Sequence, residues 1–145
     1  MFNYPIKFKV QAEAFSGIQT SWTTKALSYD CEFPVSVPIE YLGPGKGVSP
    51  EDLFAMALQN CFIATFKVFA EKSKLEYKSI LIESELEVDL DENKRGWMAR
   101  INMVIKLTGS INKEIAQHVL TKTSQGCMVL NSVNTKINFR YEFLD

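Results

Sequence analysis

The sequence predicts an α+β fold, because segments typical of strands alternate along it with two segments typical of helices. Apolar and polar residues alternate near the N-terminus, after residue 78 and at the C-terminus. A long apolar helix is predicted after Ser49-Pro50, and a shorter amphipathic helix over about Asn112 to Thr123. With 145 residues and no repeat or linker, the chain is predicted to form one domain, residues 1–145.

The N-terminal part is predicted to be an antiparallel meander. Its first ten residues, MFNYPIKFKV, alternate in the manner of a strand, and the alternation continues from about Ile6 to Tyr41. Turn signals at Ser16-Gly17 and near Asp30 separate the predicted strands. The stretch from Gly43 to Gly47 contains three glycines and a proline and is therefore predicted to be a loop.

The long helix has strong start signals. Ser49 suits the N-cap, Pro50 suits the first helical position, and Glu51 and Asp52 place negative charge at the positive end of the helix dipole. The helix is predicted to run to about Lys74. Apolar residues occur on every side of its middle, so we expect it to be covered from more than one direction.

The rest of the chain is predicted to be a hairpin, a helix and a final strand. The hairpin strands are residues 79–90 and 97–108, joined by a polar turn. The helix over 112–123 is predicted to lie on the core through one apolar stripe, with Gly126 as a stop signal. Residues 135–143 form the last strand. The predicted stripe is Ile111, Ile115, Val119 and Leu120.

Composition argues against nucleic-acid and membrane partners. The net charge is −1, from 16 Lys and Arg against 17 Asp and Glu, and no basic run occurs. The most apolar stretch, residues 53–70, includes Gln59, Asn60, Thr65 and Lys67, which favours a buried helix over a bilayer span. Three cysteines and no export signal predict a reducing, cytoplasmic location.

No metal or cofactor is predicted. His118 is the single histidine, it lies off the apolar stripe of its helix, and we expect it to be solvated or to cap the helix. The sequence contains no CxxC motif, so a metal site is not supported. The loop Gly43 to Gly47 lacks the lysine and hydroxyl residue that end a phosphate-binding loop.

Taken singly, each cysteine is more typical of packing than of chemistry. Cys61 falls in the middle of the long helix, too far from its N-terminus for the dipole to lower the thiol pKa. Cys127 follows Gly126, where exposed N–H groups can favour a thiolate, but from this residue alone a buried small residue is the favoured interpretation. Cys31 lies on a predicted strand and shows no signal beyond packing.

Two segments together resemble the OsmC/Ohr family of thiol-dependent hydroperoxide reductases. GKGVSPEDLFAMALQNCF, residues 45–62, is similar to the family's loop, helix start and first catalytic cysteine. QGCMVLNSV, residues 125–133, is similar to the segment of the second cysteine. The separation of 66 positions between Cys61 and Cys127 and the order of elements suit the family over the whole chain.

This resemblance implies an OsmC-like fold, in which antiparallel sheets wrap around a long central helix, and an intertwined homodimer. It further implies that the Cys61 thiolate attacks an organic hydroperoxide and becomes a sulfenic acid, which Cys127 converts to a disulfide. An external thiol, a dihydrolipoyl protein in some members, then reduces the disulfide. The apolar substrate, or another small apolar ligand, is expected beside Phe54, Phe62 and Phe66.

Glu51 matches the carboxylate that this family carries at the helix start. It lies ten positions before Cys61, which corresponds to about 15 Å of helical rise. A carboxylate cannot reach a thiol on its own helix over that distance, so a Glu51 that serves Cys61 must come from the partner subunit. Without such a function, Glu51 simply complements the helix dipole.

The sequence departs from the family in one important respect. Peroxidatic members use an N-terminal arginine to hold the thiolate, and this chain has no arginine before Arg95. Glu40-Tyr41 stands where one subgroup carries that arginine, so Tyr41 is the expected hydrogen-bond donor, while Lys25 or Lys46 is a source of charge without arginine's planar fork. Two alternatives therefore remain: a non-catalytic small-molecule-binding dimer and a thiol redox sensor.

Overall fold

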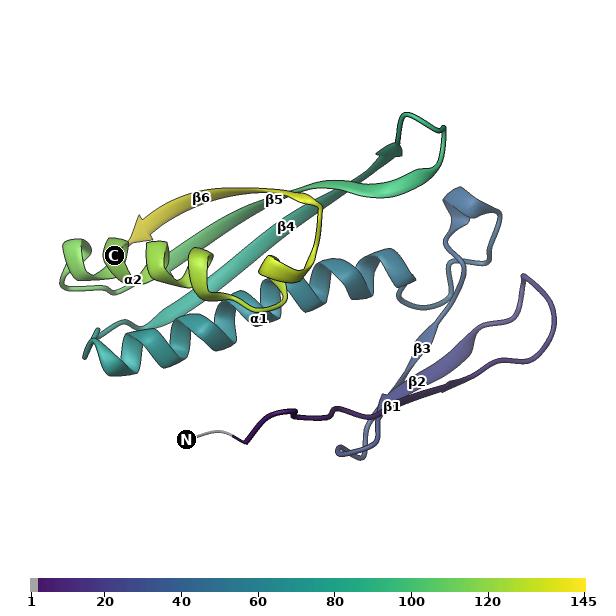
Figure 1. Cartoon of the computed structure of the whole chain (residues 1–145), viewed down its shortest axis with the longest axis horizontal. Coiled ribbons are helices and arrows are strands. Elements are labelled where there is room, and N and C mark those ends of the chain that lie inside the picture. The colour runs from purple at the N-terminus through teal and green to yellow at the C-terminus, as the bar shows by residue number, and fades with distance from the viewer. Residues whose placement is uncertain (1–2) are drawn as a thin grey trace. The chain divides into compact units, whose positions relative to one another are not determined.

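The structure, a computed structural model, describes residues 3–145 and falls into two units, Met1–Leu53 and Phe54–Asp145. The first unit contains a three-stranded sheet in the order β1-β2-β3 (Figure 1). Both strand pairs are antiparallel, which confirms the predicted meander. Its strands are β1 (Val10–Glu13), β2 (Trp22–Ala26) and β3 (Glu32–Val35), and a short 3-10 helix, η1 (Ile39–Tyr41), follows.

The strands of the first unit are shorter than the alternation of the sequence predicts. The strand expected over MFNYPIKFKV begins only at Val10, and the first two of those residues lie outside the described range. Before Val10, the pairing continues only through the bond that the Leu27 amide donates to the Lys9 carbonyl, at 2.9 Å. An alternating pattern marks which faces can be buried, but a strand also needs a neighbour with which to exchange hydrogen bonds.

Helix α1 (Pro50–Lys72) begins where the sequence predicts. The Ser49 hydroxyl accepts a hydrogen bond from the Asp52 amide at 3.0 Å, and the Asp52 carboxylate accepts one from the Ser49 amide at 2.9 Å. This reciprocal arrangement is a capping box, which satisfies two amides that the helix itself leaves unpaired. The cap depends only on adjacent residues, and this explains why sequence alone locates it.

The second unit is a three-stranded sheet with two helices on one face (Figure 1). The hairpin pair is antiparallel, as predicted, whereas the last strand runs parallel to its neighbour, so this sheet is mixed. A parallel neighbour requires a crossover connection, and a helix followed by a short 3-10 helix provides it. The elements are β4 (Ser79–Leu90), β5 (Gly96–Thr108), α2 (Lys113–Gly126), η2 (Leu130–Ser132) and β6 (Lys136–Leu144).

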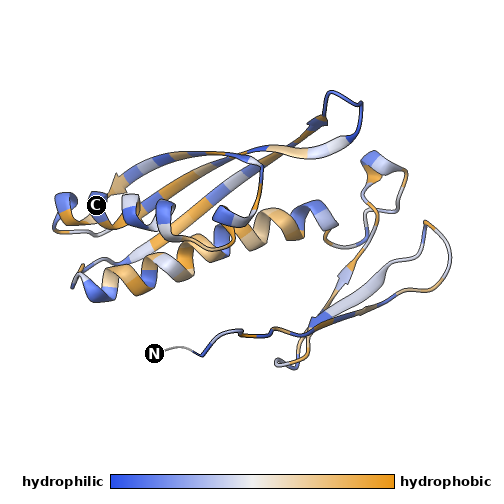
Figure 2. Ribbon diagram, viewed as in Figure 1, coloured by the Kyte–Doolittle hydropathy of each residue, from blue (hydrophilic) through white to orange (hydrophobic). Residues whose placement is uncertain are grey.

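The core of the second unit lies between α1, α2 and one face of this sheet. Apolar and polar residues alternate along the strands, as Figure 2 shows, so that every second side chain of β5 is buried. From α1, four side chains spaced by one helical turn are buried against it: Leu58, Phe62, Phe66 and Ala70. This packing fixes the part of α1 that carries Cys61.

The apolar stripe of α2 differs from the predicted one. Asn112 accepts the Ile115 amide through its side chain at 3.0 Å and is the N-cap, so Ile111 lies outside the helix and is exposed. Ile115 is also exposed. Ile111 continues the apolar spacing of the helix across the N-cap, so the spacing alone did not reveal where α2 begins. The buried residues are Ala116, Val119, Leu120 and Thr123.

The face of α1 opposite the sheet is open in the single chain. Ala57, Asn60, Ala64 and Val68 are exposed along it. By length and composition alone α1 is apolar enough to cross a membrane, a test that core helices also pass. The opposite face of α1 is already buried in the core with β5. We therefore interpret α1 as a core helix whose exposed face needs a second surface to pack against.

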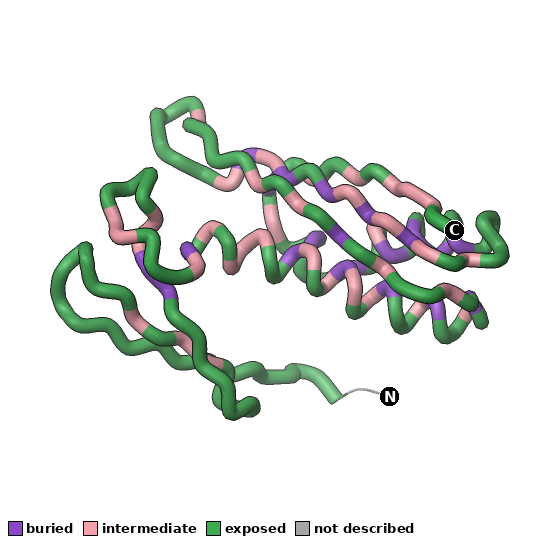
Figure 3. Tube along the Cα trace, turned by 180° about the vertical axis from the view of Figure 1, so that it is seen from behind, coloured by how far each residue is buried: buried purple, intermediate pink, exposed green. Residues whose placement is uncertain are grey.

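The first unit buries very little of its own surface. Figure 3 shows it as almost wholly exposed, in contrast to the second unit. Val35, Ser36 and Ser49 are its buried residues within the described range. Many of its large apolar side chains face solvent, including Ile6, Phe8, Val10, Phe15, Tyr29, Phe33 and Tyr41. A sheet with so little core is not stable alone and needs a surface to pack against.

Candidate functional site

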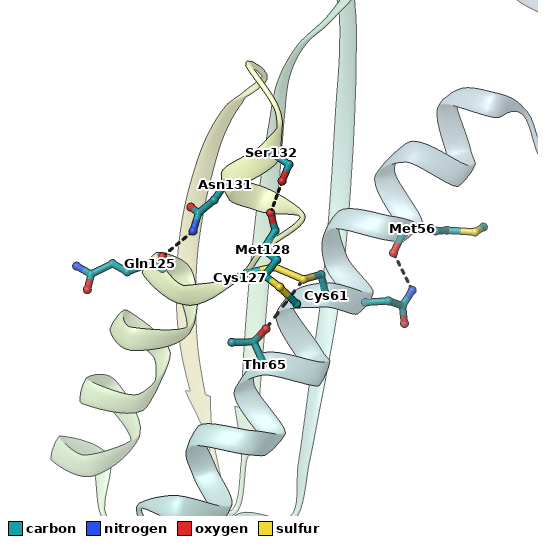
Figure 4. The surroundings of a disulfide bond; sticks show 9 residues. Met56, Cys61, Thr65, Gln125, Cys127, Met128, Asn131 and Ser132 are labelled. Atoms are coloured by element: carbon teal, nitrogen blue, oxygen red, sulfur yellow. Dashed lines mark hydrogen bonds between the residues drawn. A yellow bond between two sulfur atoms is a disulfide. The ribbon is translucent and has the colours of Figure 1, made fainter. Parts of the chain in front are cut away.

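Cys61 and Cys127 are joined by a disulfide in the second unit (Figure 4). Their Cα atoms are 6.1 Å apart, within the usual range for a disulfide. Cys127 is fully buried, whereas Cys61 is partly exposed. The two residues that the sequence singled out are therefore brought into covalent contact, and the more accessible sulfur is that of Cys61.

The position of Cys127 is set by the end of α2 and the turn that follows. Gly126 is the last residue of α2, and Cys127 is its C-cap. The Cys127 carbonyl accepts the Asn131 amide at 3.0 Å, and the Asn131 side chain donates to the Gln125 carbonyl at 2.9 Å (Figure 4). Both bonds hold the turn around Cys127 in one conformation.

Gly126 allows α2 to approach α1 closely beside this turn. A Cβ atom at Gly126 would lie 3.1 Å from Cε2 and 3.2 Å from Cζ of Phe69. A side chain at this position would therefore need the neighbouring ring to move by a few tenths of an ångström. The sequence predicted Gly126 only as a helix stop and did not reveal this contact. No local signal reveals it, because Phe69 is distant in the sequence.

Thr65 contacts the site from one turn further along α1. Its Oγ1 lies 4.0 Å from the Cys61 Sγ (Figure 4). The signal that could have found it is its spacing, since residues four apart face each other on a helix. Sequence reasoning used Thr65 only to argue against a membrane span.

Glu51 lies in the first turn of α1, and its carboxylate is left free by the cap. Asp52 is the acid that completes the capping box, whereas Glu51 Oε2 is buried and has no hydrogen-bond partner within residues 3–145. A buried carboxylate oxygen without a partner is costly, so this oxygen is available to accept a hydrogen bond from a donor outside the described chain.

The expected substrate-lining residues occupy different environments. Phe54 is partly exposed at the edge of the core. Phe62 and Phe66 are fully buried and pack on Phe139 and Tyr77, with ring centroids 5.7 Å and 5.1 Å apart. Neither ring presents surface to a ligand, so both shape the core beneath Cys61 instead of lining a pocket. Tyr41 is an exposed residue of η1 in the first unit.

The other singled-out residues are spread over both units. Cys31 is a free, exposed cysteine in the first unit. Lys25 lies on β2 and Lys46 in the loop before α1. His118 is exposed on α2 and borders a shallow depression with Ser73 and Glu114. Within the described part of the chain, no three His, Cys, Asp or Glu side chains are grouped as metal ligands.

Comparison with known proteins adds relatives and a family. A family model described as OsmC-like protein matches residues 43–142. The YmaD protein of Bacillus subtilis (strain 168), which is uncharacterized, is 27% identical over 112 residues, covering 74% of this chain and 75% of the relative.

Solved structures share the fold over nearly the whole chain at low identity. An OsmC-like protein from Mycoplasma pneumoniae matches with a TM-score of 0.81 and 16% identity, over 97% of this chain and 99% of that one. An organic hydroperoxide resistance protein from Elizabethkingia anophelis, with crystallant-derived thiocyanate bound, matches with a TM-score of 0.75 and 19% identity, over 99% of each chain. With the family model matched across residues 43–142, the chain belongs to the OsmC-like protein family.

Proposed function

We propose that this protein is a thiol-dependent peroxidase that reduces organic hydroperoxides through Cys61 and Cys127. The disulfide between these two residues carries the proposal, because it links a partly exposed sulfur to a buried one across two elements. We also propose a cytoplasmic location, and there a disulfide is usually transient and catalytic. The hydroperoxide resistance protein with the same fold supports the choice of substrate.

The reaction proceeds in three balanced steps. The Cys61 thiolate attacks the distal oxygen of the hydroperoxide, the O–O bond breaks, and the alkoxide takes a proton and leaves as an alcohol. The Cys127 thiol then displaces water from the Cys61 sulfenic acid and forms the disulfide. A dithiol such as a dihydrolipoyl group reduces the disulfide and is itself oxidised to a cyclic disulfide. No metal or cofactor takes part.

The partner subunit of a homodimer completes the site in this proposal. The first unit exposes apolar side chains that need a covering surface, and α1 leaves one side open. A second copy of the chain supplies both surfaces at once, as expected for a symmetric dimer. Glu51 and Tyr41 of the first unit then act at the Cys61 of the other chain, with Phe54 beside the apolar substrate.

Turnover of hydroperoxide with a dithiol tests the proposed function. We expect the wild-type protein to consume cumene hydroperoxide in the presence of dihydrolipoamide. Cys61→Ser should reduce consumption to the uncatalysed rate, because the nucleophile is lost. Mixed with hydroperoxide in the absence of dithiol, Cys127→Ser should consume one equivalent and leave a sulfenic acid on Cys61, because the thiol that would form the disulfide is gone. Cys31→Ser is the matched control and should keep full activity, because Cys31 is free and not part of the disulfide.

Three outcomes separate the proposal from its alternatives. Absence of dithiol-dependent consumption of both cumene and tert-butyl hydroperoxide would contradict the peroxidase. Formation of the disulfide without turnover would favour a redox sensor. An unreactive Cys61 together with a small molecule that copurifies with the protein would favour a binding dimer.

A further inference from the structure

We propose that the Thr65 hydroxyl donates a hydrogen bond to the Cys61 sulfur and stabilises its thiolate, a task that arginine performs in the peroxidatic members that this sequence resembles. The inference rests on the proposed role of Cys61 as the attacking thiol. It concerns the ground state of that thiol and can be measured without any peroxide.

The direction of the contact follows from the state of the sulfur. The Thr65 Oγ1 and Cys61 Sγ atoms are 4.0 Å apart, at the long end of the range for a hydrogen bond to sulfur, which is a weak acceptor. In the disulfide neither sulfur carries a proton. The hydroxyl is therefore the only possible donor of the pair, and the atom beside it becomes a thiolate on reduction.

Other threonines of the same unit show that this orientation is not the default. Helical threonines usually donate to the carbonyl four residues earlier. Thr121 does so to Gln117 at 2.9 Å, and Thr123 does so to Val119 at 2.7 Å. Within residues 3–145, the Thr65 hydroxyl instead has the Cys61 sulfur as its hydrogen-bond contact.

The segments around both cysteines contain no charged residue that could do this work. Residues 54–66 of α1 and residues 123–135 around Cys127 include no Asp, Glu, Lys, Arg or His. The titratable groups that reach the core are the tyrosines: Tyr77 packs on Phe66, and Tyr141 stacks on Phe139.

Lys136 is exposed at the start of β6, and the other three cations of the sheet are engaged in ion pairs. Their side chains alternate with the core-facing ones and pair with carboxylates on the sheet's outer face. The pairs are Arg100 with Glu87 and Asp89, Lys106 with Glu83, and Arg140 with Glu142. Within the described part of the second unit, the Thr65 hydroxyl is thus the side-chain hydrogen-bond contact of the Cys61 sulfur.

The effect of such a bond is moderate. Hydrogen bonding to the charged form lowers a thiol pKa. For one neutral donor at this distance, we expect its loss to raise the pKa by about half a unit to one unit. Because nucleophilicity rises with pKa, the rate of thiol reactions at neutral pH should fall by only about two- to threefold.

The test is the pH dependence of alkylation of the reduced full chain. Iodoacetamide is applied from about pH 5 to pH 10, which brackets the usual cysteine pKa, and each cysteine is followed by the mass of its peptide. Thr65→Val, which keeps the shape but not the hydroxyl, should shift the Cys61 profile upward by about half a unit to one unit. Thr65→Ser should restore it.

Two controls make the result specific. Thr121→Val removes a helical hydroxyl that bonds only to its own helix and should leave the Cys61 profile unchanged. Exposed Cys31 reports within the same molecule, and its profile should not move in any variant. An unchanged Cys61 profile in Thr65→Val, or no restoration by Thr65→Ser, would overturn the inference. Loss of hydroperoxide turnover by itself would not, because alkylation involves no peroxide.

Discussion

At the scale of single residues, side chains of the same chemical class have different structural roles because one or two contacts differ. Asp52 completes a cap, whereas Glu51 beside it keeps a buried oxygen without a partner. Thr121 bonds to its own helix, whereas Thr65 contacts the Cys61 sulfur. The sequence predicted the cap, since it is local, but it could not divide the roles of the acids or of the threonines, because tertiary contacts decide them.

Tyr141 offers a residue-scale prediction about pH. Burial raises its pKa, and the Ser124 hydroxyl opposes this in part by favouring the ionised form. As the pH rises above about 10, the unfolded chain loses the tyrosine proton while the folded chain retains it, so the free energy of unfolding falls. Tyr141→Phe should therefore lose less stability than wild type between about pH 9 and pH 11.

Urea unfolding at several pH values measures this difference as a slope. Loss of the Ser124 contact shifts the free energy of unfolding by a constant amount across the neutral range. The slope of that free energy against pH is therefore the informative quantity. Tyr29→Phe, at an exposed tyrosine, is the control and should follow wild type. Parallel pH profiles of Tyr141→Phe and wild type would show that burial does not act on Tyr141.

At the scale of elements, local signals were predictable and pairing partners were not. The start of α1 and the β4–β5 hairpin follow from caps, turns and alternation within the sequence. The parallel pairing of β6 with β5 was not predictable, because alternation does not encode the direction of a neighbour. The contact of Gly126 with Phe69 was missed for the same reason: it joins two elements that are far apart in the sequence.

The close approach of α2 to α1 at Gly126 predicts a specific redox phenotype. In Gly126→Ala, the added Cβ would press on the Phe69 ring and shift Cys127 away from Cys61. Disulfides tolerate little displacement, so we expect the equilibrium constant for forming this one against glutathione to fall by about threefold or more. Redox titration with glutathione buffers, read by alkylation and mass, measures the change.

A second-site variant and a matched glycine test the cause. Phe69→Leu in the Gly126→Ala background should restore the wild-type redox equilibrium, because it removes the ring edge that the new methyl group meets. Gly96→Ala is the control, since a Cβ there meets no atom within 4 Å. If the double variant titrates like Gly126→Ala alone, the ring contact is not what positions Cys127.

At the scale of the whole molecule, the described chain has more apolar surface than it can cover. Phe8, at 90% exposure, is the extreme case, and the open side of α1 is another. The sequence anticipated the open side of α1, since apolar residues all around this helix indicate cover on several sides. The helical distance from Glu51 to Cys61 requires a second subunit only if Glu51 serves Cys61, and the homodimer stays a prediction. One chain shows two compact units, and the single domain expected over residues 1–145 stays a prediction.

Mixed dimers test whether the first unit acts on the partner. A Glu51→Gln chain and a Cys61→Ser chain, coexpressed with different tags and purified as the mixed dimer, retain one intact pairing of Glu51 with Cys61 only if the pairing crosses the interface. We expect this dimer to keep about half of the wild-type turnover per dimer, because one of its two equivalent sites is intact. Hydroperoxide consumption measures it.

The two parent homodimers serve as controls. Cys61→Ser should be inactive and Glu51→Gln impaired, so any higher activity in the mixed dimer is complementation. A mixed dimer with no more than half the activity of the Glu51→Gln homodimer would show that Glu51 does not act across the interface. A wild-type chain that sediments as a monomer at micromolar concentration would contradict the homodimer itself.

The central claim is that hydroperoxide is reduced by forming the Cys61–Cys127 disulfide. Its most direct test mixes the reduced wild-type chain with one equivalent of cumene hydroperoxide and then maps the cysteines by peptide mass. We predict one cumyl alcohol per chain, a peptide pair linked through Cys61 and Cys127, and Cys31 still free. Intact hydroperoxide beside unmodified Cys61 and Cys127 thiols would contradict the claim.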